Sequence, residues 1–283
     1  MRHTYECPLR WADMDLLGHI NNVAYVDYLQ EARIELLAAH PELAVVRDGE
    51  GLVVVHHELD YVAPLKFRKR PVLVDSWITD MRAGSFVLAH EVYDEGEHGR
   101  TTYLRASTRV ASMDLASGAP RRIGVEDRSV LEAYLEPAEP RRPLSAAGRP
   151  VHVHPVRVRW SDLDTYHHVN NVKYIEFFQE ARVGYTRSMH QEGDVFGPFV
   201  IARVDVDYRR PMGFRREPFH VHSWVSHVGG SSAVFVSELR DGDTVLASSR
   251  VVAVGFDPET QRSAPMLPDH RTRLLEHLER ASL

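Results

Sequence analysis

One block of sequence occurs twice in this chain of 283 residues. RWADMDLLGHINNVAYVDYLQEAR runs from Arg10 to Arg33, and RWSDLDTYHHVNNVKYIEFFQEAR runs from Arg159 to Arg182. Matched positions lie 149 residues apart throughout the block, as His168 and His19 do, without a gap. A repeat of this length and regularity predicts a chain built from two copies of one folded module.

The duplication continues beyond this block with a slightly different offset. LVVVHHELDYVAPL (52–65) corresponds to FVIARVDVDYRRPM (199–212), which places Asp207 147 residues after Asp60. Between the copies, the segment 135–150 is rich in Pro, Ala and Arg without apolar periodicity, which is typical of an exposed linker. The predicted organisation is module 1 over 1–136, a linker over 137–150 and module 2 over 151–283.

The pattern within each copy predicts one long helix and five strands. In the first copy the expected strands are TYECPLRW, LVVVHHELDYV, PVLVDSWITDM, SFVLAHEVYD and TTYLRASTRVASM. An Asn pair in each copy, 21–22 and 170–171, precedes a stretch with helical apolar spacing, and Asn is a favoured helix N-cap. A short charged helix is expected at the end of each copy, over 124–135 and 268–281. The order predicts an α+β fold of two tandem modules, in each of which a five-stranded antiparallel sheet curls around a long central helix.

Composition narrows the class of protein. The chain is 43% hydrophobic and 26% charged, with a formal net charge of -6, which argues against nucleic acid as a partner. The N-terminal sequence has no signal-peptide pattern, and no apolar run approaches the roughly 20 residues of a membrane span. A single cysteine fits a reducing compartment. We expect a cytoplasmic protein that binds neither nucleic acid nor membrane.

The repeated motifs resemble a known signature. D-x-x-G-H-I-N-N-x-x-Y from Asp15 and D-x-Y-x-H-V-N-N-x-K-Y from Asp164 resemble hotdog-fold thioesterases of the 4-hydroxybenzoyl-CoA thioesterase superfamily. The second copy is similar to bacterial long-chain acyl-CoA thioesterases and to plant acyl-ACP thioesterases, which are tandem hotdogs. The resemblance implies a sheet wrapped around a helix in each module, an active site between paired modules, an acyl-CoA substrate, no cofactor, and a homo-oligomer of double-hotdog chains.

Hydrolysis of a thioester needs a base or nucleophile that delivers water to the carbonyl carbon. Asp15 and Asp164 each lie a few residues before the expected helix, and the resemblance gives them the principal catalytic role. His19 and His168 follow four residues later, where an imidazole can orient water, shuttle a proton or position the carboxylate. Whether the aspartate acts as base or as nucleophile is left open.

The same reaction needs donors for the oxyanion that forms. Backbone N–H groups of a first helical turn lack intrahelical acceptors and carry the positive end of the helix dipole. The expected substrate-binding donors are Asn22, Val23, Asn171 and Val172. Tyr166 provides a further donor in the second copy, and the corresponding Leu17 does not, so we expect the Asp164 site to dominate on long acyl chains. The plant enzymes have Asn at this position, so an Asn-assisted mechanism is not transferred.

Two basic clusters are candidates for binding the phosphates of coenzyme A. KFRKR (66–70) and FRRE (214–217) occupy the same place in the two copies. The candidate residues are Arg68, Lys69, Arg215 and Arg216. A solvated turn is an equally good interpretation, because loops at sheet edges are commonly charged.

Other polar residues of interest receive structural interpretations. Asp13 and Asp162 recur two positions before the catalytic candidates, and we expect them to hydrogen-bond the turn. Cys7 has no counterpart in the second copy and is interpreted as a small buried apolar residue. The histidine pairs 152/154 and 220/222 have strand spacing but lack a third ligand, so no metal is expected.

These observations predict a hydrolase that cleaves fatty acyl-CoA to a free fatty acid and CoA. One alternative is a thioesterase acting on acyl chains carried by acyl carrier protein, which the acidic net charge mildly disfavours because that partner is itself acidic. Another is a non-catalytic acyl-CoA-binding module, against which the retention of both Asp and His in both copies argues.

Overall fold

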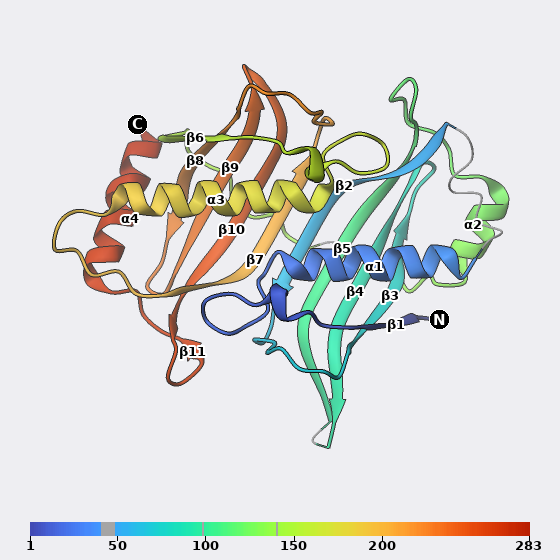
Figure 1. Cartoon of the computed structure of the whole chain (residues 1–283), viewed down its shortest axis with the longest axis horizontal. Helices are drawn as coiled ribbons and strands as arrows, with labels where there is room; N and C mark the ends of the chain where they lie inside the picture. Colours follow the sequence, from blue (N-terminus) through green and yellow to red (C-terminus); the bar gives the residue numbers. More distant parts are fainter. Residues whose placement is uncertain (41–48, 98, 140) are drawn as a thin grey trace. The chain divides into compact units, whose positions relative to one another are not determined.

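The chain folds into two compact units, Met1–Arg141 and Arg142–Leu283. We describe them from a computed structural model, which defines residues 1–40, 49–97, 99–139 and 141–283. Each unit consists of an antiparallel sheet with a long helix against one face (Figure 1).

Unit 1 begins with a short strand and a 3-10 turn, followed by its long helix and four longer strands. The elements are β1 (His3–Cys7), a 3-10 turn (Trp11–Asp13), α1 (Ala24–Ala38), β2 (Glu50–Tyr61), β3 (Val72–Met81), β4 (Ser85–Gly96), β5 (Gly99–Asp114) and α2 (Val125–Glu132). The strand order across the sheet is β1-β3-β4-β5-β2, with every pair antiparallel.

Unit 2 repeats this order and adds a small hairpin. Its elements are β6 (His152–Val156), a 3-10 turn (Trp160–Asp162), α3 (Asn171–Met189), β7 (Phe199–Tyr208), β8 (Phe219–Val228), β9 (Ser232–Asp241), β10 (Thr244–Asp257), β11 (Arg262–Ser263) and α4 (Pro268–Ser282). The order β7-β10-β9-β8-β6 matches that of unit 1, and β11 pairs with β10.

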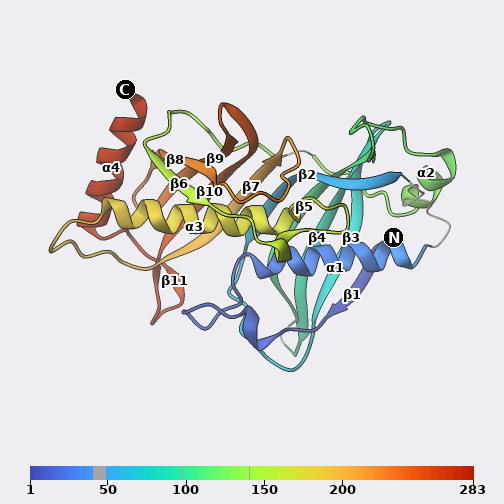
Figure 2. The same cartoon turned by 45° about the horizontal axis from the view of Figure 1, so that its top comes forward.

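The apolar face of each long helix explains its position. Tyr28, Leu29, Ala32 and Leu36 of α1 recur at helical spacing and are all at most 5% exposed. Burying a large apolar side chain contributes about 1.5–3 kcal/mol, so this face fixes α1 on the sheet. Figure 2 shows β1 running beside α1, and the two elements are in contact. In unit 2, α3 packs through an equivalent face against β6, β8, β9 and β10.

The secondary structure follows the sequence predictions with one shortened strand. Both terminal charged helices are confirmed, as α2 and α4. The first strand was predicted over 4–11 but ends at Cys7, because Pro8 cannot donate to the ladder and the chain then enters the 3-10 turn. Among the described residues, no helix has the length and apolar character to cross a membrane.

Candidate active site

In unit 1, the chain from Asp15 to His19 forms a small closed loop. The backbone N–H of Asp15 donates to the carbonyl of His19 at 2.7 Å, and that of Gly18 donates to the carbonyl of Asp15 at 3.1 Å. One carboxylate oxygen, Oδ1 of Asp15, accepts the N–H groups of Leu17 at 2.8 Å and His19 at 3.1 Å. The carboxylate is therefore built into the loop and its orientation is fixed by the backbone.

Unit 2 contains the same loop around Asp164. Its Oδ1 accepts the N–H groups of Tyr166 at 2.9 Å and His168 at 3.2 Å, and its N–H donates to the carbonyl of His168 at 2.8 Å. Both aspartates are partly exposed, and Oδ2 of each makes no hydrogen bond to the described residues. One oxygen thus positions the side chain, and the other is available to water or to a carbonyl carbon.

One position of this loop adopts the left-handed backbone conformation in both units. Gly18 has a φ of 73°, and His167, which occupies the corresponding place, has a φ of 59°. Glycine adopts this conformation without steric cost, but a residue with a side chain does so only under constraint. Unit 2 therefore holds strain in its loop that unit 1 avoids.

Each loop is attached to the strand that follows the long helix and to the segment just after that strand. In unit 1, the N–H of Ile20 donates to the carbonyl of Leu65 at 2.7 Å, and the Tyr61 hydroxyl donates to the carbonyl of Asn22 at 2.7 Å. In unit 2 the same contacts join Val169 to Met212 at 2.8 Å and Tyr208 to Asn171 at 3.0 Å. The loop and the helix start therefore form one hydrogen-bonded frame in each unit.

Two of the backbone N–H groups that were predicted to bind the oxyanion, those of Val23 and Val172, already have acceptors. The N–H of Val23 donates to Oδ1 of Asn21 at 2.9 Å, and the N–H of Val172 donates to Oδ1 of Asn170 at 2.9 Å. These groups are already satisfied by asparagine caps and are not free to bind an oxyanion. The first asparagine of each pair is the one that caps, and the known preference of N-cap side chains for the N–H two residues on explains this arrangement.

The remaining donor of unit 1 is the backbone N–H of Asn22. It has no acceptor in the part of the chain that the structure defines, while the carbonyl of the same residue is held by Tyr61. It lies at the start of α1, where the helix dipole favours negative charge. Asn22 therefore keeps its predicted role as a candidate oxyanion donor.

Asp13 and Asp162 have the structural role that the sequence predicted. Oδ2 of Asp13 accepts the N–H of Arg10 at 3.1 Å, and Oδ2 of Asp162 accepts the N–H of Arg159 at 2.6 Å, which closes each 3-10 turn. Asp13 also accepts the hydroxyl of Tyr28 at 2.6 Å.

The histidines of the two motifs differ in exposure. His19 is 6% exposed, whereas His168 is partly exposed. Nearby, burial raises the pKa of Tyr25 and of Tyr174, so both hydroxyls stay protonated at neutral pH. Tyr25 packs edge-on against Tyr61, with ring centroids 5.5 Å apart. The loops therefore lie beside an uncharged aromatic wall.

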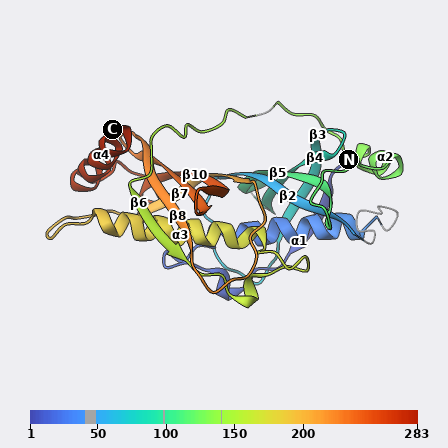
Figure 3. The same cartoon turned by 90° about the horizontal axis from the view of Figure 1, so that it is seen from above.

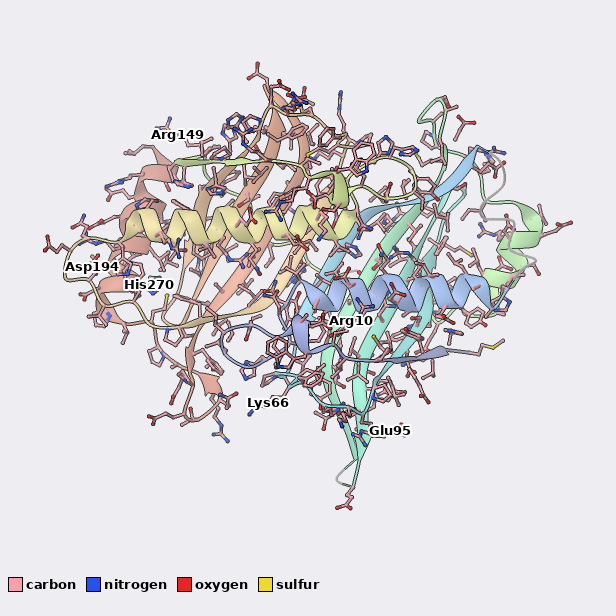
Figure 4. The ribbon with its side chains drawn as sticks, in the orientation of Figure 1. Arg10, Lys66, Glu95, Arg149, Asp194 and His270 are labelled. Carbon is pink, nitrogen blue, oxygen red and sulfur yellow. The ribbon has the colours of Figure 1, made fainter. Side chains whose placement is uncertain are left out.

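The two basic clusters separate into a paired and an exposed part. Arg68 forms an ion pair with Asp94, and Arg215 pairs with Asp241 at 2.8 Å, so both arginines hold their loop to a neighbouring hairpin. Asp94 and Asp241 are 147 residues apart, the offset of the repeat, which is a signal that the sequence prediction missed. Lys69 and Arg216 of the same clusters, and the labelled Lys66, are exposed (Figure 4). This geometry favours a structural role for Arg68 and Arg215. Lys69 and Arg216 stay candidates for binding the phosphates of coenzyme A.

Cys7 is buried, and burial raises the pKa of its thiol to about 12. A thiol with this pKa is not a nucleophile at neutral pH. The sequence interpretation of Cys7 as a small buried apolar residue is confirmed.

The family model of the Thioesterase-like superfamily matches residues 9–145 and 158–274. The chain belongs to the Thioesterase-like superfamily. The family resemblance of the two motifs is thereby confirmed. The chain is also 28% identical over 128 residues to the long-chain acyl-CoA thioesterase FadM of Escherichia coli, a match that covers 42% of this chain and 93% of FadM.

Two solved structures share the fold of nearly the whole chain. An oleoyl thioesterase (putative) from Lactobacillus plantarum superposes with a TM-score of 0.73 at 14% identity, over 91% of this chain and 97% of that one. The 12:0-ACP thioesterase of Umbellularia californica gives a TM-score of 0.69 at 17% identity, over 90% and 94% respectively. Both superpositions extend over nearly the whole of this chain, so the fold of both units is shared with these two proteins.

Proposed function

We propose that this protein hydrolyses the thioester of fatty acyl-CoA to a free fatty acid and CoA. The observation that carries the proposal is the pair of equivalent loops in which Asp15 and Asp164 each present an unengaged carboxylate oxygen. Membership of the Thioesterase-like superfamily and the similarity to a long-chain acyl-CoA thioesterase support the reaction class.

In the proposed reaction, Oδ2 of the aspartate takes a proton from water, and the resulting hydroxide adds to the thioester carbonyl carbon. The N–H at the start of the helix, that of Asn22 in unit 1, stabilises the oxyanion. Collapse of the tetrahedral intermediate breaks the C–S bond, and the proton held by the aspartate neutralises the departing CoA thiolate. His19 and His168 orient the water. Direct attack by the carboxylate, through an anhydride that water then opens, uses the same geometry.

The proposal includes the organisation of the chain. Each unit is a hotdog module, with its sheet wrapped around α1 or α3. Module 1 (1–136) and module 2 (151–283) are joined by a linker (137–150), and the double-hotdog chain associates into a homo-oligomer. Covalent fusion keeps the two modules at a high effective concentration.

The decisive experiment measures release of free CoA thiol from acyl-CoAs of increasing chain length. The double variant Asp15→Asn with Asp164→Asn keeps an acceptor for the loop N–H groups and removes the charge. We expect hydrolysis to fall by at least about a hundredfold with the fold intact. The matched control is Asp13→Asn with Asp162→Asn, which makes the same chemical change two residues earlier and is expected to leave kcat within about threefold.

Near-wild-type activity of the double variant would end the assignment of both aspartates. Binding of acyl-CoA without any thiol release by the wild type would instead identify a non-catalytic acyl-CoA-binding module. Acyl chains presented on acyl carrier protein form a second arm of the assay, and a kcat/KM higher than that for acyl-CoA would replace the proposed substrate. Single variants then rank the two sites, and we expect Asp164→Asn to lose more kcat than Asp15→Asn on a long acyl chain.

A further inference from the structure

Unit 2 has a cavity away from the aspartate loop. It has a volume of about 230 Å³ and lies between the strands β8, β9 and β10 and the segment that precedes β6. Its charged lining consists of four arginines and one glutamate, on a chain whose net charge is -6: Arg149, Arg209, Arg240, Arg250 and Glu238. Such a local excess of positive charge in a concave site attracts anions.

This cavity lies on the face of the sheet opposite α3. Along β9, Leu239 is fully buried, whereas Glu238 and Arg240 on either side of it line the cavity, as strand alternation requires. Helix α4 covers the same outer face, where Ala281 packs against Trp224 and Val236. Figure 3 shows α4 at the end of the unit 2 sheet, where it contacts β8 and, through His277, Tyr185 of α3. The cavity is therefore separate from the loop of Asp164.

The outer wall of the cavity is a hydrogen-bonded segment. The indole N–H of Trp224 donates to the carbonyl of Ala147 at 2.9 Å, and the N–H of Arg149 donates to the carbonyl of Ala281 at 2.9 Å. Gly148 has a φ of 109°, and a Cβ there would come within 2.8 Å of the Trp224 ring. Only glycine permits this close approach. The next residue, Arg149, lines the cavity and is labelled in Figure 4.

The arginines of this cavity are not all neutralised. Arg240 is paired with Glu238, and Nη1 of Arg250 donates to Asp207 at 2.9 Å. Nε of Arg250 is buried and has no partner, and the guanidinium groups of Arg149 and Arg209 make no ion pair with the residues the structure defines. A buried donor without an acceptor costs free energy, which a bound anion would recover.

We propose that this cavity, lined by Arg149, Arg209 and Arg250, is a binding site for a phosphate group. Guanidinium forks match the geometry of phosphate oxygens, and three of them around one cavity suit a dianion better than a carboxylate. The volume is below the roughly 300–1,000 Å³ of pockets that enclose drug-sized ligands, so the cavity cannot enclose coenzyme A. The ligand is inorganic phosphate or a small phosphomonoester, and the site is independent of the proposed thioesterase activity.

The first unit provides an internal comparison. Leu104 pairs with Tyr61 on β2, and Ala247 pairs with Tyr208 on β7, so position 250 corresponds to position 107. Position 107 is Ser, and position 62, which corresponds to Arg209, is Val. The set of Arg149, Arg209 and Arg250 is therefore specific to unit 2. A cavity of about 720 Å³ in unit 1 is lined by five other arginines, and all five form ion pairs: Arg2, Arg82, Arg105, Arg109 and Arg141.

The test is isothermal titration calorimetry of the full chain with inorganic phosphate at constant ionic strength, with chloride as the exchanged ion. We expect saturable binding at one site. The double variant Arg149→Ala with Arg209→Ala should weaken it by about tenfold or more, because both side chains are exposed and removable without loss of the fold. Arg250→Lys, which retains the charge but not the fork, should weaken it as well. The matched control is Arg210→Ala, an exposed neighbour that does not line the cavity.

Further outcomes decide the proposal. Glycerol 3-phosphate that binds as tightly as phosphate would identify a site for a phosphomonoester, and binding of phosphate alone would identify a site for the free ion. Unsaturable heats, or equal phosphate affinity in the wild type and the Arg149/Arg209 double variant, would overturn the proposal. Competitive displacement of phosphate by CoA would also overturn it, since the phosphate would then occupy the substrate site.

Discussion

One residue in each aspartate loop has the left-handed backbone conformation, and opposite substitutions at these two positions should change stability in opposite directions. Gly18 and His167 occupy the same place, with φ values of 73° and 59°. A Cβ added to Gly18 would meet no heavy atom within 4 Å, so Gly18→Ala changes only the backbone preference. His167→Gly makes the opposite change in unit 2. The two substitutions therefore test whether the loop of unit 2 stores strain.

The magnitude follows from two opposing effects. An L-residue in the left-handed conformation costs about 1–2 kcal/mol relative to the right-handed one. Replacing glycine also restricts the unfolded chain, which returns about 0.4–1 kcal/mol. We therefore expect Gly18→Ala to lower the free energy of unfolding by about 0.5–1 kcal/mol, and His167→Gly to raise it by a similar amount.

Urea unfolding followed by circular dichroism measures both changes as shifts of the transition midpoint at constant m. The matched control is Gly118→Ala, which has a φ of 68° and equally open space but lies in the turn after β5. It should cost the same stability as Gly18→Ala, because the backbone conformation and the open space are the same. A more stable Gly18→Ala protein, or a less stable His167→Gly protein, would refute the strain argument.

Three further predictions concern groups outside the loops. Because burial raises the pKa of Cys7 to about 12, the native thiol should resist a disulfide reagent at pH 8 and Cys7→Ser should keep full turnover; rapid labelling would contradict this. Burial lowers the pKa of His270 to about 4, below its ordinary value of about 6.5, so the folded state holds it neutral and loses stability as the pH falls from 6.5 towards 4. His270→Phe should flatten this fall in urea midpoints between pH 7 and pH 5, and an unchanged slope would exclude His270 as its source. The exposed Lys69 and Arg216 should contribute to CoA binding, so replacing both with Ala should raise KM for acyl-CoA more than it lowers kcat, and an unchanged KM would make them a solvated turn.

The architecture and the place of the Asp15 and Asp164 loops could be predicted from the sequence alone. The constant offset of the repeated block predicted two copies of one fold, and apolar spacing located both long helices, because these signals are local and each residue's neighbours lie within a few positions. The Asp15 loop could be predicted in the same way, because its carboxylate accepts hydrogen bonds from N–H groups only two and four residues later in the chain.

Which polar groups are free to act could not be predicted from the sequence and became clear from the folded chain. Val23 lost its predicted role because Asn21 takes its N–H, and Arg68 is held by Asp94, 26 residues away. The arginines around the outer cavity of unit 2 come from positions as distant as 149 and 250, and nothing in their local sequence brings them together. Whether a polar group is available depends on the partners that strand register and packing place beside it, and these are set by contacts between distant parts of the chain.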